Sequence, residues 1–187
     1  LRLVGSEMCI RDRANLAMAF AFPPAKSLKE RIILQVGNGI FGYLPVSRLF
    51  TEIREKQSLA YAIHSGLDFH RSFALVRAGI SPDKVAHVYE EVQAQLADLM
   101  ASLEEGDYLE EVKLTLLSAD VQSRDYQHLE TDKMIAQDLY PDFDLSTDYF
   151  ESVVRALKAE EIIACLGKWR LVGAYALVGG KDERTLS

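Results

Sequence analysis

The stretch Ser47–Ser65, SRLFTEIREKQSLAYAIHS, changes in its middle from a helical to a strand pattern. Residues 45–56 predict a helix, because their apolar side chains recur at helical spacing. These side chains are Leu49, Phe50 and Ile53. From Leu59 onward the pattern alternates, with Leu59, Tyr61 and Ile63 on one side and Ala60, Ala62 and His64 on the other. Alternation predicts a strand, so Arg54 lies near the end of the helix and Tyr61 near the start of the strand.

Three further segments have strand patterns. Residues 15–22, NLAMAFAF, alternate strictly between large apolar residues and alanines. We expect a helix to pack closely on the alanine face, because alanine leaves room for its backbone. Residues 73–79 follow a short polar link, which predicts a hairpin with the strand that begins at Leu59. Residues 171–178 are apolar on both faces, which predicts a strand buried within the sheet.

Helical spacing of apolar residues also predicts helices in the rest of the chain. They are residues 27–40, 81–105 (ended by Gly106), 107–140, 147–157 and 159–169. Ser27 followed by Glu30 is typical of a capping box, and Ser81 before Pro82 is typical of a helix start. The glycines between positions 37 and 42 predict a loop after the first helix.

The order of these segments predicts the fold class. Helix and strand runs are grouped rather than alternating along the chain. Grouping favours an α+β fold. We therefore expect a two-layer sandwich, in which helices pack on one face of a largely antiparallel sheet.

Residues 1–13, LRLVGSEMCIRDR, have neither a helical nor a strand period. The run Glu7–Asp12 back-translates to GAG ATG TGT ATA AGA GAC, which looks like a sequencing adapter read as protein. We exclude such segments from the fold. The predicted domain is thus residues 14–187, a fragment of a longer chain.

Composition restricts the class of partner. Lys and Arg total 21 against 28 Asp and Glu, a net charge of −7, which argues against nucleic-acid binding through phosphates. The sequence lacks the long apolar run of a membrane span, so no membrane partner is expected. Of the two cysteines, Cys9 falls in the adapter-like segment, and Cys165 is expected to be a buried free thiol.

Motifs for metal or catalytic chemistry are absent from the sequence. The four histidines form neither the zinc-binding motif His-Glu-x-x-His nor its inverse, His-x-x-Glu-His. His64 and His70 flank the predicted hairpin but have no cysteine or carboxylate at ligand spacing. We therefore predict no metal site, no catalytic residue and no cofactor in this chain.

Arg54 and Tyr61 have two interpretations. In the local one, Arg54 interacts with the helix C-terminus and Tyr61 is an ordinary half-buried strand aromatic. In the binding one, the guanidinium donates two parallel hydrogen bonds to a carbonyl or carboxylate, and the phenol donates a further one. The residues alone leave both interpretations open.

The segment SRLFTEIREKQSLAY resembles the C-terminal half of the insulinase/pitrilysin-type zinc peptidases and their non-catalytic relatives. In that family a helix, Arg-Glu-Lys and Leu-Ala-Tyr occur in this order. The resemblance covers most of residues 14–187 and implies a metallohydrolase-like half-domain. In active members this half and an N-terminal, zinc-carrying half form a clamshell around an extended peptide. Arg54 and Tyr61 match the substrate-contacting pair, so the resemblance implies substrate binding for both.

Ser58 departs from the glycine that active members often carry. The segment Arg54–Tyr61, REKQSLAY, is most similar to a bacterial branch associated with aminopentanol modification of elongation factor P. Members of that branch commonly lack an intact zinc motif. The resemblance implies a non-catalytic, peptidase-like subunit of the bacterial cytoplasm that binds a peptide or protein partner. Its companion would be a related peptidase-like subunit or an N-terminal half, and any zinc would belong to that missing half.

Two other functions remain open from the sequence. The chain could be the substrate-binding C-terminal half of an active zinc endopeptidase, with its metal ligands upstream. It could also be a purely structural subunit around an empty chamber, in which case Arg54 and Tyr61 would be dispensable.

Overall fold

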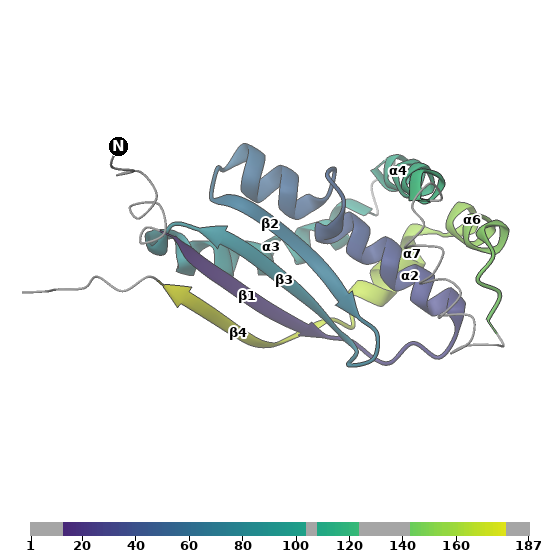
Figure 1. The fold of residues 1–187 in the computed structure, drawn as a ribbon, viewed down its shortest axis with the longest axis horizontal. Coiled ribbons are helices and arrows are strands. Elements are labelled where there is room, and N and C mark those ends of the chain that lie inside the picture. Colours follow the sequence, from purple (N-terminus) through teal and green to yellow (C-terminus); the bar gives the residue numbers. More distant parts are fainter. Residues whose placement is uncertain (1–12, 104–107, 124–142, 179–187) are drawn as a thin grey trace, which may run out of the picture.

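A computed structural model describes residues 13–103, 108–123 and 143–178. Within them, one layer is a four-stranded sheet and helices cover one of its faces (Figure 1). The strands are β1 (Ala14–Ala21), β2 (Ala60–Asp68), β3 (Phe73–Ile80) and β4 (Arg170–Val178). They lie in the order β2-β3-β1-β4, and every pair is antiparallel. The α+β two-layer fold and the hairpin of β2 and β3 are therefore confirmed.

The helices follow the predicted segments, with several differences at their ends. They are α2 (Leu28–Asn38), α3 (Val85–Leu103), α4 (Tyr108–Ser123), α6 (Thr147–Ala156) and α7 (Ala159–Leu166), with the π-helices η1 (Gly39–Tyr43) and η2 (Leu49–Lys56) and the 3-10 turn η3 (Pro82–Lys84). Ser27 Oγ accepts the N–H of Glu30 at 3.2 Å, as predicted, but the Glu30 carboxylate accepts from Lys26 N–H. Beyond Ser123, the predicted helix 107–140 lies outside the described residues. None of the described helices is long and apolar enough to cross a membrane.

β1 turns its large side chains, not its alanines, toward the helices. Leu16, Met18 and Phe20 are buried, while the alternating alanines from Ala17 to Ala21 are half-buried on the opposite face. The expectation of a helix on the alanine face is therefore wrong for the described part of the chain. Larger side chains remove more apolar area from water, so burying them stabilises the fold more.

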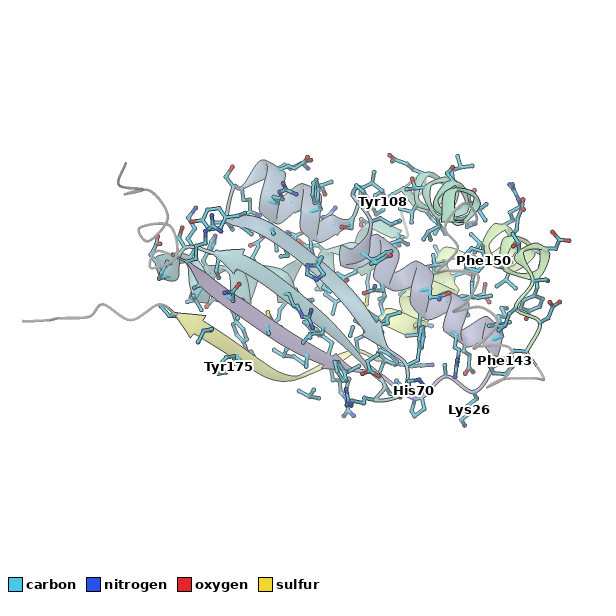
Figure 2. The ribbon with its side chains drawn as sticks, in the orientation of Figure 1. Lys26, His70, Tyr108, Phe143, Phe150 and Tyr175 are labelled. Carbon is cyan, nitrogen blue, oxygen red and sulfur yellow. The ribbon has the colours of Figure 1, made fainter. Side chains whose placement is uncertain are left out.

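β4 is an edge strand rather than an interior one. Within the described ranges it pairs with β1 alone. Its Val172, Tyr175 and Leu177 are exposed, and Figure 2 shows Tyr175 at this border of the sheet. The prediction of a buried strand is wrong, because an apolar composition reports hydrophobicity and not the place of a strand in its sheet.

The glycines from Gly37 to Gly42 lie in α2 and η1, which form a continuous helical path instead of the predicted loop. η1 extends α2 in π-helical geometry through residues 39–43. A Cβ at Gly37 would lie 3.2 Å from Leu166 Cδ2, and one at Gly42 would lie 2.7 Å from Leu49 Cδ1. The glycines therefore serve close packing of helices, which a sequence pattern does not distinguish from a turn.

An aromatic cluster joins the two layers. The ring centroids of Phe20 and Phe41 are 6.1 Å apart, and Trp169 lies 5.9 Å from Phe41 and 5.8 Å from Phe22. These residues come from β1 and the segment after it, from η1, and from the turn before β4. The cluster thus ties η1, and through it η2, to the end of β1 and the start of β4.

Candidate binding corner

The segment from η2 to β2, residues 54–61, forms a corner at Ser58. η2 ends at Lys56, and Leu59 N–H donates back to Ile53 O at 2.9 Å. Ser58 has a φ of 51°, in the left-handed region that glycine adopts most readily. This backbone conformation accounts for the glycine that the resemblance leads one to expect here. It also shows that Ser58 can make the same turn.

Arg54 presents its guanidinium without a hydrogen-bond partner among the described residues. Its side chain is exposed, and its Cζ lies 4.6 Å from the centre of the Phe50 ring. The neighbouring cations Arg48 and Lys56, in contrast, both form ion pairs with Glu52. The guanidinium lies over Phe50, one turn before Arg54. No hydrogen bond among the described residues therefore supports the local interpretation, in which Arg54 interacts with the C-terminus of the helix. The donors of the fork remain available to a ligand.

Tyr61 projects from a β-bulge. Ala60 pairs with Ile80 and Ala62 with Gly79, so Tyr61 is the extra residue of β2. Its side chain is 54% exposed, whereas Ile63 is buried. The expected alternation, with Tyr61 and Ile63 on one side, is therefore wrong at this point. Bulges redirect side chains and are invisible to a period-two pattern.

Residues after β3 hold this corner through side-chain hydrogen bonds. The Tyr61 and Ser81 hydroxyl oxygens are 2.7 Å apart, and Lys84 Nζ donates to Ser58 O at 2.9 Å. Gln57 Nε2 donates to Glu91 Oε1 at 2.7 Å. The sequence offered no signal for these contacts, because the partners are 20 to 34 residues apart along the chain.

Glu91 also links the corner to α3. Its Oε1 accepts from Gln95 Nε2 at 2.7 Å, and Arg48 Nε donates to Gln95 Oε1 at 2.8 Å. The hydrogen bonds from Gln57 and Gln95 lower the pKa of Glu91 below its usual value. The carboxylate form therefore fits the network that fastens η2 to α3.

Ser81 behaves differently from its predicted role. It occupies the N-cap position of η3 with Pro82 behind it, but its side chain makes no capping hydrogen bond. The hydroxyl lies against Tyr61 instead. β3 ends at Ile80, opposite Ala60, so the residue after β3 falls beside the bulge of β2.

The histidines do not contribute to this corner as metal ligands. Within residues 13–103, 108–123 and 143–178, no group of three or more His, Cys, Asp or Glu side chains is arranged to hold a metal ion. His70 lies in the β2–β3 turn, and Figure 2 shows it at the opposite end of β2 from the corner.

Cys165 is half-buried rather than fully buried. Burial raises the pKa of its thiol to about 11. The side chain is therefore a thiol and not a reactive thiolate near neutral pH.

A family model of the peptidase M16 inactive domain matches residues 5–116, more than half of the chain. The chain belongs to the M16 inactive-domain family. This confirms the resemblance to the insulinase/pitrilysin-type C-terminal half. The match therefore identifies the chain as a peptidase-like domain.

Proteins of similar sequence or structure align with most of this chain. The probable inactive metalloprotease YmfF of Bacillus subtilis (strain 168) is 26% identical over 150 residues, or 78% of this chain and 34% of that protein. A conserved protein of Enterococcus faecalis V583 has a similar crystal structure, with a TM-score of 0.80 and 26% identity over 90% of this chain and 40% of that one. An M16 inactive domain of Pseudomonas fluorescens shares the fold, with a TM-score of 0.67, 17% identity, and coverage of 91% and 43%. The chain therefore spans less than half the length of these relatives.

Proposed function

We propose that this M16 inactive domain binds an extended peptide or protein partner at the η2–β2 corner, without cleaving it itself. The proposal rests on the exposure of Arg54 and Tyr61 and on the hydrogen bonding of Arg54. Both are exposed on one short corner, and the Arg54 guanidinium has no hydrogen-bond partner among the described residues. A guanidinium fork with free donors suits a peptide carbonyl or a carboxylate, and an exposed phenol on the same segment offers a further polar contact.

The surroundings of Arg54 support binding more than a structural role for that residue, whereas the centre of the Tyr61 ring also lies 5.6 Å from Arg13 Cζ. Arg54 rests on the Phe50 ring, which restricts the side chain without using its N–H groups. Tyr61 stands out of the sheet at a bulge, with its hydroxyl fixed at Ser81. A restricted donor loses less entropy when it binds than a freely rotating one.

We further propose that the opposite wall of the site is supplied by an N-terminal half or a related peptidase-like subunit. The described residues offer no group suited to zinc, so no step of this proposal runs through a metal. A cytoplasmic location and a link to elongation factor P modification extend the proposal, and rest on the resemblance of the REKQSLAY segment alone.

The rival function is that of a substrate-binding half of an active zinc endopeptidase. The corner would serve either protein equally well, so the upstream reading frame separates them. An intact His-x-x-Glu-His there, together with zinc measured in the purified full-length protein, would favour the enzyme. Absence of both would favour the non-catalytic subunit.

Substitution of Arg54 by Lys tests the binding role. Lysine keeps the charge but lacks the planar fork, so affinity for a carbonyl or carboxylate should fall about tenfold, roughly 1.4 kcal/mol. The measurement is fluorescence anisotropy of fluorescein-labelled peptides of unfolded casein with the full-length protein. Arg155→Lys on α6, where the guanidinium pairs with Glu151, is the control. Equal affinities for wild type and Arg54→Lys would remove the proposed function.

A further inference from the structure

The residues that follow β3 meet the binding corner at two separate points. Ser81 contacts the Tyr61 hydroxyl, and Lys84 contacts the carbonyl of Ser58. Both Ser81 and Lys84 are half-buried, and neither lies beside Arg54 or Tyr61 in the sequence. Contacts of this kind restrict the direction of Tyr61 without themselves facing a ligand.

The Ser81–Tyr61 contact can order the proton of the phenol. Either oxygen can be the donor across the 2.7 Å contact. A tyrosine hydroxyl carries one proton, so it can donate to a ligand only when Ser81 donates to it. The resulting chain, from Ser81 Oγ–H to Tyr61 Oη and from Tyr61 Oη–H to a carbonyl, also strengthens each bond by polarisation.

The Lys84–Ser58 contact holds the turn that sets the start of β2. Ser58 has a left-handed backbone conformation, which is unfavourable for a residue with a Cβ. Lys84 Nζ donates to its carbonyl at 2.9 Å, and this charged donor stabilises the turn. A change in the turn would move Tyr61, which follows shortly after it.

We propose that Ser81 and Lys84 are positioning residues for the Arg54–Tyr61 site. Ser81 donates to the Tyr61 oxygen and so aims its proton at the ligand, while Lys84 keeps the Ser58 turn in its left-handed form. This inference rests on the proposed function and assigns the residues that prepare the site for binding.

A double-mutant cycle tests Ser81 in the full-length protein. With labelled casein peptides as the probe, Ser81→Ala should weaken binding about threefold to tenfold in the wild-type background. In the Tyr61→Phe background the same change should have no further effect, because the hydroxyl through which it acts is gone. Ser81→Thr, which keeps a hydroxyl, should restore the affinity. Ser152→Ala, at an exposed position of α6, should leave binding unchanged.

A spectroscopic signal separates positioning from general stability. With 3-fluorotyrosine incorporated at position 61, the ¹⁹F resonance should shift in Ser81→Ala but not in Ser152→Ala. An unchanged resonance, or equal losses of affinity in the wild-type and Tyr61→Phe backgrounds, would overturn the role of Ser81. If Arg54→Lys itself binds like wild type, the proposed function fails instead.

A rescue experiment tests Lys84. Lys84→Met should weaken binding of the same peptides about threefold, and Ser58→Gly should restore much of that loss, because glycine adopts the left-handed turn without support. Lys158→Met, at the start of α7, is the matched control. Failure of Ser58→Gly to rescue Lys84→Met, with the fold intact by circular dichroism, would overturn the role of Lys84.

Discussion

Ser58 and Ser72 are the two described non-glycine residues with positive φ, at 51° and 56°. Each lies where the chain reverses, Ser58 before β2 and Ser72 in the turn before β3. Such conformations cost about 1 kcal/mol or more for a residue with a Cβ. The turn at Ser58 persists because its carbonyl has a partner in Lys84 and the next N–H has one in Ile53.

Gly42 is the residue where added volume should matter most. A Cβ there would lie 2.7 Å from Leu49 Cδ1 and 2.8 Å from Ser65 Oγ. Ser65 is fully buried and donates to Asn38 Oδ1, so it has little freedom to move. Gly42→Ala should therefore lower the free energy of unfolding by about 1–3 kcal/mol, measured by urea denaturation.

Gly66 provides the matched control for that measurement. It lies in β2 near Ser65, but a Cβ there meets nothing within 4 Å. Gly66→Ala should leave stability within about 0.5 kcal/mol of wild type or raise it slightly. Equal effects of the two substitutions would contradict the close packing of η1 on η2 and β2.

At the scale of elements, η2 is fastened to α3 by a chain of polar side chains. Gln57 and Gln95 both donate to Glu91, and Arg48 donates to Gln95. These contacts place the helix that carries Arg54 against the helix that follows Ser81 and Lys84. The binding corner thus depends on two elements that are distant in sequence.

Acid should weaken this connection. Hydrogen bonds lower the pKa of Glu91 in the folded protein, so its carboxylate stabilises the fold above the unfolded pKa, and that contribution is lost as pH falls through the folded pKa. The destabilisation caused by Glu91→Gln should therefore be largest near about pH 7 and shrink toward about pH 3. Urea denaturation of both proteins across this range gives the difference.

Glu90→Gln controls for the loss of one negative charge, since Glu90 is an exposed neighbour on α3. It should show little pH-dependent difference from wild type. A Glu91→Gln effect that stays constant down to about pH 3 would mean that the carboxylate does not hold the network.

At the scale of the whole molecule, the single tryptophan reports on the junction of the layers. Trp169 is the only tryptophan in the chain and is 6% exposed. It packs against Phe20 and Phe22 of the sheet side and Phe41 of η1. Its fluorescence therefore follows the contact between layers, while far-ultraviolet circular dichroism follows the helices.

We expect both signals to change at the same urea concentration. The layers share one core, so separating them should unfold the helices as well, in a single cooperative transition. The tryptophan emission should move to longer wavelength at the circular-dichroism midpoint. A tryptophan transition that clearly precedes loss of helix would show that the layers separate first.

Much of the fold could be predicted from the sequence, and less of the site. The grouping of segments predicted the α+β class, and the alternation at residues 59–64 and 73–79 predicted the hairpin. The orientation of β1, the edge position of β4 and the helical path through Gly39–Tyr43 were predicted wrongly. A motif suggested Arg54 and Tyr61 as candidate site residues, but Ser81, Lys84 and Glu91 had no signal that connected them to it.

The residues alone were sufficient to predict most of the element types, the net charge and the family, because periodicity and short motifs depend on residues close together in the chain. The folded arrangement was needed to learn which face of β1 the helices cover, where Tyr61 points and which hydroxyl it meets. These outcomes depend on apolar area and hydrogen bonds summed over segments that are far apart in sequence. A bulge of one residue in β2 and the end of β3 at Ile80 brought Tyr61 and Ser81 together, and neither feature has a local pattern.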